Sequence, residues 1–324
     1  MTSTKALQSV LLIGASGMAG GGVGKALSDA GVPVRAFLRP GQNAGALAFQ
    51  PTDVAFGNLL QPESLSAAME GVGTVLYFAS TTVPATSQYD PSIEYALTLP
   101  ALNNTLLAME RGSGRRIIFP SSGGTIYGPR DTPADENSPL LPHSGYGLGK
   151  LMAEQAIEFF GRAGGLTYDI LRVTNVYGSA AKRRSPQGVI DVFLDDAIAG
   201  RASVVWGAPQ TERDYIFVDD VADAVLSLMS HPDRPNGVYN LGASQTHSLQ
   251  AVLDVIARVT DGRHSFTIDP LHASGVTRSA VDCTHLTATT GWAPRWTLYD
   301  GILETWRRKL RLITELQPPV SLHP

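Results

Sequence analysis

Two side chains that can move a proton stand four positions apart in the middle of the chain. The segment Tyr146-Gly147-Leu148-Gly149-Lys150 places a phenol at position i and an ammonium group at position i+4. On a helix these positions share one face, so the two groups are expected to lie together. A phenol is a poor base near neutral pH, and neighbouring positive charges must lower its pKa before it accepts a hydroxyl proton. Lys150 would supply one such charge, which makes the pair a candidate for acid/base chemistry.

A second segment with a recognisable chemical role is the glycine-rich stretch Gly14–Gly20 near the N-terminus. It follows an apolar run over 10–13 that is typical of a buried parallel strand, and it precedes a predicted helix over 23–30. Glycines in such a turn let the backbone approach a pyrophosphate, while free N–H groups and the helix dipole face the anion. With the acid/base pair, this dinucleotide site indicates an oxidoreductase whose nicotinamide cation adds to the charge of Lys150. The predicted contacts in the turn are Gly14, Ser16, Gly17, Met18, Ala19 and Gly20.

The end of the second predicted strand bears on the choice of dinucleotide. An acid there would accept hydrogen bonds from the adenosine ribose and repel a 2′-phosphate. The strand ends in Leu38-Arg39 without an acid, and the guanidinium of Arg39 can pair with a phosphate. The sequence therefore favours NADP over NAD, the alternative being that Arg39 is only a solvated surface charge. Asn58 and Leu59 are expected at the adenine edge.

A strand that ends in hydroxyl groups and glycines supplies a third chemical group. The apolar run 117–119 leads into Ser121-Ser122-Gly123-Gly124. Hydroxyls at the carboxyl edge of a parallel strand lie where open α/β sheets bind their ligands. A Tyr and a Lys at this spacing occur by chance on many helices. The strand that ends in serines and glycines is the additional feature that makes the pair a predicted site.

Apolar strand-like runs alternate with helical patterns over the first half of the chain. The runs cover 10–13, 34–38, 75–79, 117–119 and 170–173, and the predicted helices include 147–160 and 97–110, the latter starting or kinking near Pro100. This pattern predicts an α/β fold, a Rossmann-type doubly wound parallel sheet with a smaller mixed α/β substrate lobe. We expect residues 1–178 and 214–242 to form the dinucleotide-binding domain. Residues 179–213 and 243–324 are expected to form the lobe, with a helix over 189–198.

Composition narrows the class of protein. The 324 residues are 43% hydrophobic and 17% charged, which is typical of a globular protein. The net charge of −4, without long blocks of like charge, gives no nucleic-acid surface, and no apolar stretch reaches the ~18 residues of a membrane span. The lone Cys283 cannot form an internal disulfide and favours the cytoplasm. The histidines lack metal-ligand spacing, so no metal is expected.

Several motifs occur in a characteristic order along nearly the whole chain. They are Gly14–Gly20, Phe78–Pro84, Ser121–Gly128, Tyr146–Lys150, Leu171–Gly178, Arg213–Asp220 and Gly291–Pro294. In this order and spacing, the chain resembles an extended short-chain dehydrogenase/reductase of the NAD-dependent epimerase/dehydratase family. Within that family it is similar to nucleotide-sugar 4-epimerases.

The resemblance implies roles for the central residues. Ser122 matches the catalytic Ser/Thr, Tyr146 the general acid/base, and Lys150 the lysine that binds the ribose. The cofactor contacts expected beyond the glycine turn, Arg39 and the adenine edge are Phe78, Ala79, Ser80, Tyr146, Lys150 and Val173.

The resemblance also implies contacts with a nucleotide-sugar. Asn175 and Arg213 match positions that usually touch it, and Arg213 can pair bidentately with a diphosphate. The alternative for Arg213 is a structural salt bridge to Asp214 or Asp219. Arg278 is a second candidate of the same kind. The full set of expected substrate contacts is Thr81, Ser122, Gly123, Thr125, Asn175, Arg213 and Arg278.

Three departures from the family pattern limit what the resemblance implies. Leu38 replaces the acid that most relatives carry, which puts NAD in doubt. The helix asparagine expected near Leu99 is absent, and the asparagines at 103–104 are shifted. The glycines at 123–124 leave no acid beside Ser122, where family dehydratases and decarboxylases place Asp or Glu.

The resulting expectation is an NAD(P)-dependent nucleotide-sugar epimerase that inverts C4 through a transient 4-keto sugar. An NADPH-dependent 4-ketoreductase of a 4-keto-6-deoxy sugar is the first alternative, which Arg39 favours. A non-catalytic redox sensor is the second, against which the intact Ser122, Tyr146 and Lys150 argue. The expected partners are a nucleotide-sugar and, from the family, a second copy of the chain, with no nucleic acid and no membrane.

Overall fold

A seven-stranded parallel sheet forms the centre of the molecule. The computed structural model describes residues 9–84, 86–112, 115–178, 188–206, 208–269 and 278–316. The strand order is β10-β6-β5-β4-β1-β2-β3, so the direction of winding reverses between β1 and β4. The strands are β1 (Ser9–Ile13), β2 (Val34–Leu38), β3 (Asp53–Phe56), β4 (Val72–Tyr77), β5 (Arg116–Ser122), β6 (Thr167–Val173) and β10 (Gly237–Leu241).

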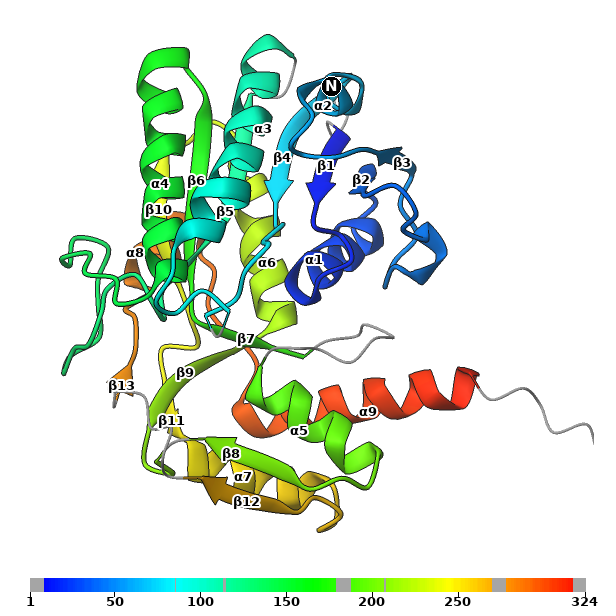
Figure 1. Ribbon diagram of the computed structural model, residues 1–324, viewed down its shortest axis with the longest axis vertical. Coiled ribbons are helices and arrows are strands. Elements are labelled where there is room, and N and C mark those ends of the chain that lie inside the picture. The colour runs from blue at the N-terminus through cyan, green and yellow to red at the C-terminus, as the bar shows by residue number, and fades with distance from the viewer. Residues whose placement is uncertain are drawn as a thin grey trace, which may run out of the picture.

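Helices cover both faces of this sheet (Figure 1). One face carries α1 (Met18–Asp29) and α6 (Val218–Met229), and the other carries α2 (Pro62–Ala68), α3 (Leu99–Arg111) and α4 (Gly145–Gly164). Because both faces are covered, the inner strands are nearly continuous apolar runs. The doubly wound Rossmann-type sheet predicted from those runs is confirmed.

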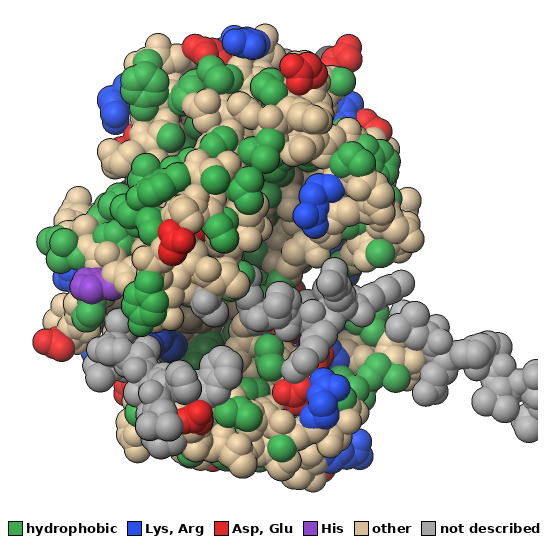
Figure 2. Space-filling model, viewed as in Figure 1, with side chains coloured by type: hydrophobic (Ala, Val, Ile, Leu, Met, Phe, Trp, Pro, Cys, Tyr) green, Lys and Arg blue, Asp and Glu red, His purple; other side chains and the backbone are tan. Residues whose placement is uncertain are grey.

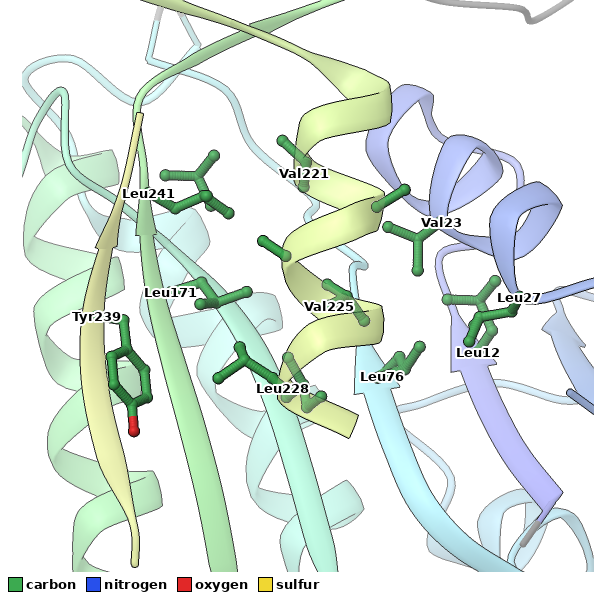
Figure 3. Packing of buried hydrophobic residues seen from close by; sticks show 14 of the residues in the cluster. Leu12, Val23, Leu27, Leu76, Leu171, Val221, Val225, Leu228, Tyr239 and Leu241 are labelled. Atoms are coloured by element: carbon green, nitrogen blue, oxygen red, sulfur yellow. The ribbon is translucent and has the colours of Figure 1, made fainter. Parts of the chain in front are cut away.

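The buried side chains between α1, α6 and the sheet show how the first strand and its helix are held (Figure 3). Leu12 on β1 and Leu76 on β4 are fully buried, and so is Leu27 on α1. Val225 on α6 packs into the same cluster. Each such side chain stabilises the fold by roughly 1.5–3 kcal/mol relative to an exposed one. This packing fixes the strand and the helix that flank the glycine turn.

A smaller part of the chain lies beyond the carboxyl ends of the central strands (Figure 1). Strand β9 is the middle of a small sheet and pairs with β7, β11 and β13, while β8 pairs with β12. A separate apolar cluster joins α5, α7 and α9. The elements are β7 (Asn175–Tyr177), α5 (Val189–Ile198), β8 (Ser203–Trp206), β9 (Glu212–Phe217), β11 (Thr246–Ser248), α7 (Leu249–Val259), β12 (Phe266–Asp269), β13 (Arg278–Ser279), α8 (Thr284–Thr290) and α9 (Leu298–Leu316).

Several helix ends differ from the sequence-based prediction. Helix α1 begins at Met18 rather than near 23, because Gly17 in an extended conformation already forms its N-cap. Helix α4 is longer than 147–160, since Ser144 caps its start and the left-handed Gly165 ends it. A π-helical turn, η2 (Glu94–Thr98), precedes α3, whose first turn contains Pro100 as expected. A 3₁₀ turn, η1 (Ala44–Ala46), follows β2.

Two negative findings concern only the described part of the chain. Among those residues, no helix is both long and apolar enough to cross a membrane. In the same residues, no group of three or more His, Cys, Asp or Glu side chains is arranged to hold a metal ion.

Candidate active site

The glycine turn after β1 has the close packing that its sequence requires. Gly14 has φ +93°, and a Cβ built there would lie 2.5 Å from the carbonyl carbon of Phe78. A Cβ at Gly20 would lie 2.2 Å from the carbonyl oxygen of Gly14. Gly17 caps α1 without a side-chain hydrogen bond, so the first N–H groups of the helix remain available to an anion. The turn therefore fits a pyrophosphate.

The loop after β2 lies beside this turn. The exposed Arg39 donates its backbone N–H to Oε1 of Gln42 at 2.7 Å. The amide of Gln42 in turn donates to the hydroxyl of Ser16 at 3.3 Å. These contacts connect the residue that follows β2 to the glycine turn. The adenosine ribose of a dinucleotide is expected near the first and its pyrophosphate near the second.

The turn at Asn58 and Leu59 is held by a hydrogen bond from α3 that the sequence does not predict. Asn58 Oδ1 accepts the N–H of Leu60 at 3.0 Å. The carbonyl of Leu59 accepts a hydrogen bond from the amide of Asn104 on α3 at 3.0 Å. The shifted helix asparagine thus fixes the backbone at Leu59.

The segment after β4 runs alongside the glycine turn. Phe78 donates its N–H to the last carbonyl of β1 at 2.7 Å. Ser80 Oγ donates to the carbonyl of Thr82 at 2.8 Å. The hydroxyls of Thr81 and Thr98 share a hydrogen bond of 2.5 Å, which joins this segment to η2.

Helix α4 holds Tyr146 and Lys150 close together beside the carboxyl end of β5. Lys150 Nζ donates to the carbonyl oxygen of Pro120 on β5 at 2.8 Å. It also lies 4.7 Å from the ring centroid of Phe119 and 5.7 Å from that of Tyr146. The N–H of Tyr146 donates to the carbonyl of Ser87 at 2.8 Å. The backbone contact with Pro120 places the pair next to the strand that ends in Ser122.

Burial dominates the electrostatics of this pair. It raises the pKa of Tyr146 to about 12, and the charge of Glu94 acts in the same direction. Burial lowers the pKa of Lys150 to about 8, while Glu94 and Glu154 oppose that change. Lys150 therefore does not by itself lower the pKa of the phenol, and a further positive charge is needed. No sequence pattern predicts Glu94 at this position beside the pair.

Ser122 ends β5 with its hydroxyl held in place. Thr125 Oγ1 donates to Ser122 Oγ at 2.8 Å, and the N–H of Gly123 donates to the carbonyl of Val173 at 2.8 Å. A Cβ at Gly123 would lie 2.7 Å from the carbonyl oxygen of Arg172. No acidic side chain could be accommodated directly after Ser122 without moving that backbone.

A buried polar network beneath this segment was also missed from the sequence. Arg172 on β6 forms an ion pair with Glu154 on α4 at 2.8 Å. It also donates to the hydroxyl of Tyr127 at 3.0 Å, and this hydroxyl donates to Asn240 Oδ1 at 2.6 Å. The network joins α4, β6, β10 and the segment that follows Ser122.

Three of the residues expected to contact a nucleotide-sugar lie on the small sheet, namely Asn175, Arg213 and Arg278. The amide of Asn175 on β7 donates to the backbone carbonyl of Asp214 at 2.8 Å. Arg213 on β9 donates to the carbonyl of Glu212 at 2.8 Å, and Arg278 on the adjacent β13 lies 3.4 Å from the Glu212 carboxylate. The two arginines are thus carried by neighbouring strands.

The two acids considered as partners of Arg213 have other contacts. Asp219 forms an ion pair with Arg308 at 2.6 Å. Asp214 Oδ1 accepts the N–H of Ala243 at 2.8 Å. Each of the two acids thus has a structural partner other than Arg213.

The fold and site together define a class of protein, an extended short-chain dehydrogenase/reductase. A glycine turn follows the first strand, and α4 holds the tyrosine and the lysine against β5, the strand that ends in Ser122. The chain belongs to the NAD dependent epimerase/dehydratase family, whose sequence profile matches residues 10–242.

Its relatives include both epimerases and a reductase. It is 28% identical over 330 residues to a UDP-glucose 4-epimerase of Azospirillum brasilense, covering 95% of this chain and 94% of that one. It is 29% identical to a dTDP-4-dehydro-6-deoxyglucose reductase of Escherichia coli, over 71% and 73% of the two chains. The structure of UDP-glucose 4-epimerase from Thermotoga maritima with UDP-glucose matches with a TM-score of 0.84 at 24% identity, covering 94% and 99%. The Thermus thermophilus enzyme in complex with NAD matches with a TM-score of 0.84 at 24% identity, covering 93% and 99%.

Proposed function

We propose that the protein is a nicotinamide-dinucleotide-dependent 4-epimerase of a nucleotide-activated hexose. The observation that carries the proposal is the bond from Lys150 to Pro120, which holds Lys150 against the strand that ends in Ser122. The glycine turn, whose Gly20 leaves no room for a side chain, supports a dinucleotide at the same edge. UDP-glucose 4-epimerases among the relatives support the reaction.

In this proposal the side chains of the chain itself orient the sugar and move one proton. A nicotinamide dinucleotide bound at the glycine turn would supply a reversible hydride acceptor. Tyr146 accepts the proton of the 4-hydroxyl and gives it back, while Ser122 donates a hydrogen bond to the same oxygen. Lys150 and the cation of a bound nicotinamide would together provide the positive charge that favours the ionised phenol. Inversion at C4 would require the 4-keto sugar to turn in the site before Tyr146 returns the proton.

We assign the two parts of the chain to two ligands. Residues 1–178 and 214–242 would hold the dinucleotide, and 179–213 with 243–324 would hold the nucleotide-sugar; residues 179–187 and 270–277 lie outside the described part. Arg213 and Arg278, on neighbouring strands, would pair with the diphosphate. Asn175, Thr81 and Thr125 would complete the sugar site.

The observations that bear on the choice of dinucleotide point in two directions. Several neighbouring structures contain NAD, among them the enzymes of Thermus thermophilus and Bifidobacterium longum, and they favour NAD. The preference for NADP rests on the exposed Arg39 at the end of β2, where it lies near the glycine turn. Binding constants for both dinucleotides decide between them.

A 4-ketoreductase is the second candidate, supported by the reductase of Escherichia coli among the relatives. It would use the same Tyr146 and Lys150 but consume its dinucleotide. A dehydratase is less well supported, because the crowded Gly123 excludes an acid beside Ser122. A non-catalytic sensor would not require Lys150 to be held against β5 next to Tyr146, so this contact argues against that function.

We also propose that two copies of the chain pair through η2 and α4. Tyr95 on η2 is 47% exposed, and Met152 and Phe159 on α4 are 37% and 57% exposed. Figure 2 shows hydrophobic side chains gathered over this side of the molecule. Phe159→Glu should convert a dimer to a monomer in sedimentation, and a wild-type monomer would contradict the pairing.

The buried Cys283, which forms no disulfide, supports a cytoplasmic location.

The reaction is tested by its redox balance. Nucleotide-hexoses carrying UDP, dTDP or GDP are incubated with enzyme and a trace of dinucleotide, and the anomeric protons are followed by NMR. A 4-epimerase should give a mixture of C4 epimers without net consumption of dinucleotide. Strict dependence on stoichiometric NADPH, with no interconversion of any hexose tested, would instead establish the reductase.

A further inference from the structure

A buried carboxyl group lies against the proposed acid/base pair. Glu94 is only 1% exposed and is the first residue of the π-helical turn η2. The hydroxyl of Thr82 donates a hydrogen bond to its Oε1. π-Helical turns are rare and often occur at functional sites. Because burying a carboxyl group costs free energy, its position next to the pair calls for a physical reason.

Gly149 is the residue that admits this carboxyl group. A Cβ built at Gly149 would lie 2.8 Å from both Cγ and Oε2 of Glu94. Gly149 stands three residues after Tyr146 and directly before Lys150, so Glu94 packs on the helix face that carries the phenol. Any larger residue at 149 would have to displace the Glu94 side chain.

The charge of Glu94 acts on both members of the pair. It raises the pKa of Tyr146 and opposes the lowering of the Lys150 pKa by burial. The other carboxylate that acts on Lys150 is Glu154, which is already paired with Arg172 at 2.8 Å. Among the described residues, Glu94 is therefore less compensated by a positive charge than Glu154, the other carboxylate that acts on the ammonium group.

We propose that Glu94 is a positioning residue of the acid/base site. Its carboxylate, packed on Gly149, stabilises the protonated forms of both Tyr146 and Lys150. The proposal rests on the proposed function only in giving Tyr146 an acid/base role. Removing one negative charge lowers both proton affinities, so the first apparent pKa of the coupled pair falls whichever group loses its proton. Glu94 would thus set the pH range in which the pair works.

The direct test is the ionisation of Lys150 without any ligand. The chain has five lysines, so NMR of lysine-labelled protein can follow each one, with Lys150→Arg identifying the signal of interest. Glu94→Gln preserves size and removes the charge. It should lower the Lys150 pKa, which burial sets at about 8 in the wild type, by about one unit or more. An unchanged Lys150 pKa would overturn the proposal, whereas a purely structural role would lower stability without moving it.

Two further variants make the result specific. Gly149→Ala should push the Glu94 carboxylate away and shift the Lys150 pKa in the same direction, and this variant decides the matter if Glu94→Gln does not fold. Glu158→Gln removes a carboxylate of the same helix that pairs with Arg162 at 3.7 Å, and it should leave the Lys150 pKa unchanged. An equal shift in that control would contradict a specific role for Glu94.

The pH profile of turnover separates this inference from the proposed function. In Glu94→Gln the rising limb of sugar oxidation should move to lower pH. If Tyr146→Phe abolishes turnover and Glu94→Gln leaves the profile in place, only the role of Glu94 is refuted. If Tyr146→Phe keeps normal turnover, the proposed function fails, and the Lys150 titration still decides whether Glu94 controls its proton.

Discussion

Replacing Gly20 by alanine tests the packing of the glycine turn, and Gly21→Ala provides a matched control one residue away on α1. The Cβ at Gly20 would lie 2.2 Å from the carbonyl oxygen of Gly14, which is 1.2 Å inside an ordinary contact of 3.4 Å. At Gly21 the nearest atom, the carbonyl oxygen of Ala15, is already 3.4 Å away. The crowded atom at Gly20 is backbone, so the turn itself has to move.

The comparison of the two variants isolates the cost of this movement. Each substitution gains about 1 kcal/mol of helix propensity, and this gain cancels in the difference. Overpacking costs roughly 1–3 kcal/mol, so Gly20→Ala should be less stable than Gly21→Ala by that amount in urea unfolding. Its dinucleotide affinity, measured by calorimetry, should fall about tenfold or more, which is about 1.4 kcal/mol. Equal stability and equal affinity in the two variants would refute the reasoning.

Three further substitutions test the cofactor site and the buried charges. Arg39→Ala should weaken NADP(H) by about 1.5–3 kcal/mol and leave NAD(H) nearly unchanged; equal losses for both dinucleotides in titrations would show that Arg39 does not bind a 2′-phosphate. Glu154→Gln leaves the guanidinium of Arg172 buried without its carboxylate and should cost about 3–5 kcal/mol in urea unfolding, so a loss below about 1 kcal/mol would contradict this. Burial raises the pKa of Asp214 to about 6, above about 3.9 in the unfolded chain, so this group should lower stability as pH rises between those values. Asp214→Asn should remove that component, about 2–3 kcal/mol, and parallel stability curves for the two proteins would contradict it.

The strands that the sequence predicted are those buried on both faces. β1 and β2 appear within one residue of the apolar runs, because their burial leaves little room for polar side chains. The edge strands β3 and β10 were missed. β3 is partly exposed, and the apolar run of β10 is interrupted by Asn240, which is buried and accepts a hydrogen bond from Tyr127.

The spacing of Tyr146 and Lys150 could be read from the sequence because a helix places i and i+4 together. The position of Glu94 could not. Its contact with Gly149 depends on the π-helical turn and on how η2 packs against α4, neither of which leaves a local pattern. The same holds for Asn104, whose bond to Leu59 spans 45 positions in the sequence.

Turnover of Tyr146→Phe, with dinucleotide binding measured on the same preparation, tests the central claim most directly. The substitution removes the ionisable hydroxyl with little change in volume at a position held by α4. Turnover of the nucleotide-sugar should fall about 10²–10⁴-fold, while dinucleotide affinity stays close to that of the wild type. Near-normal turnover in this variant would contradict the assignment of Tyr146 as the group that takes and returns the proton.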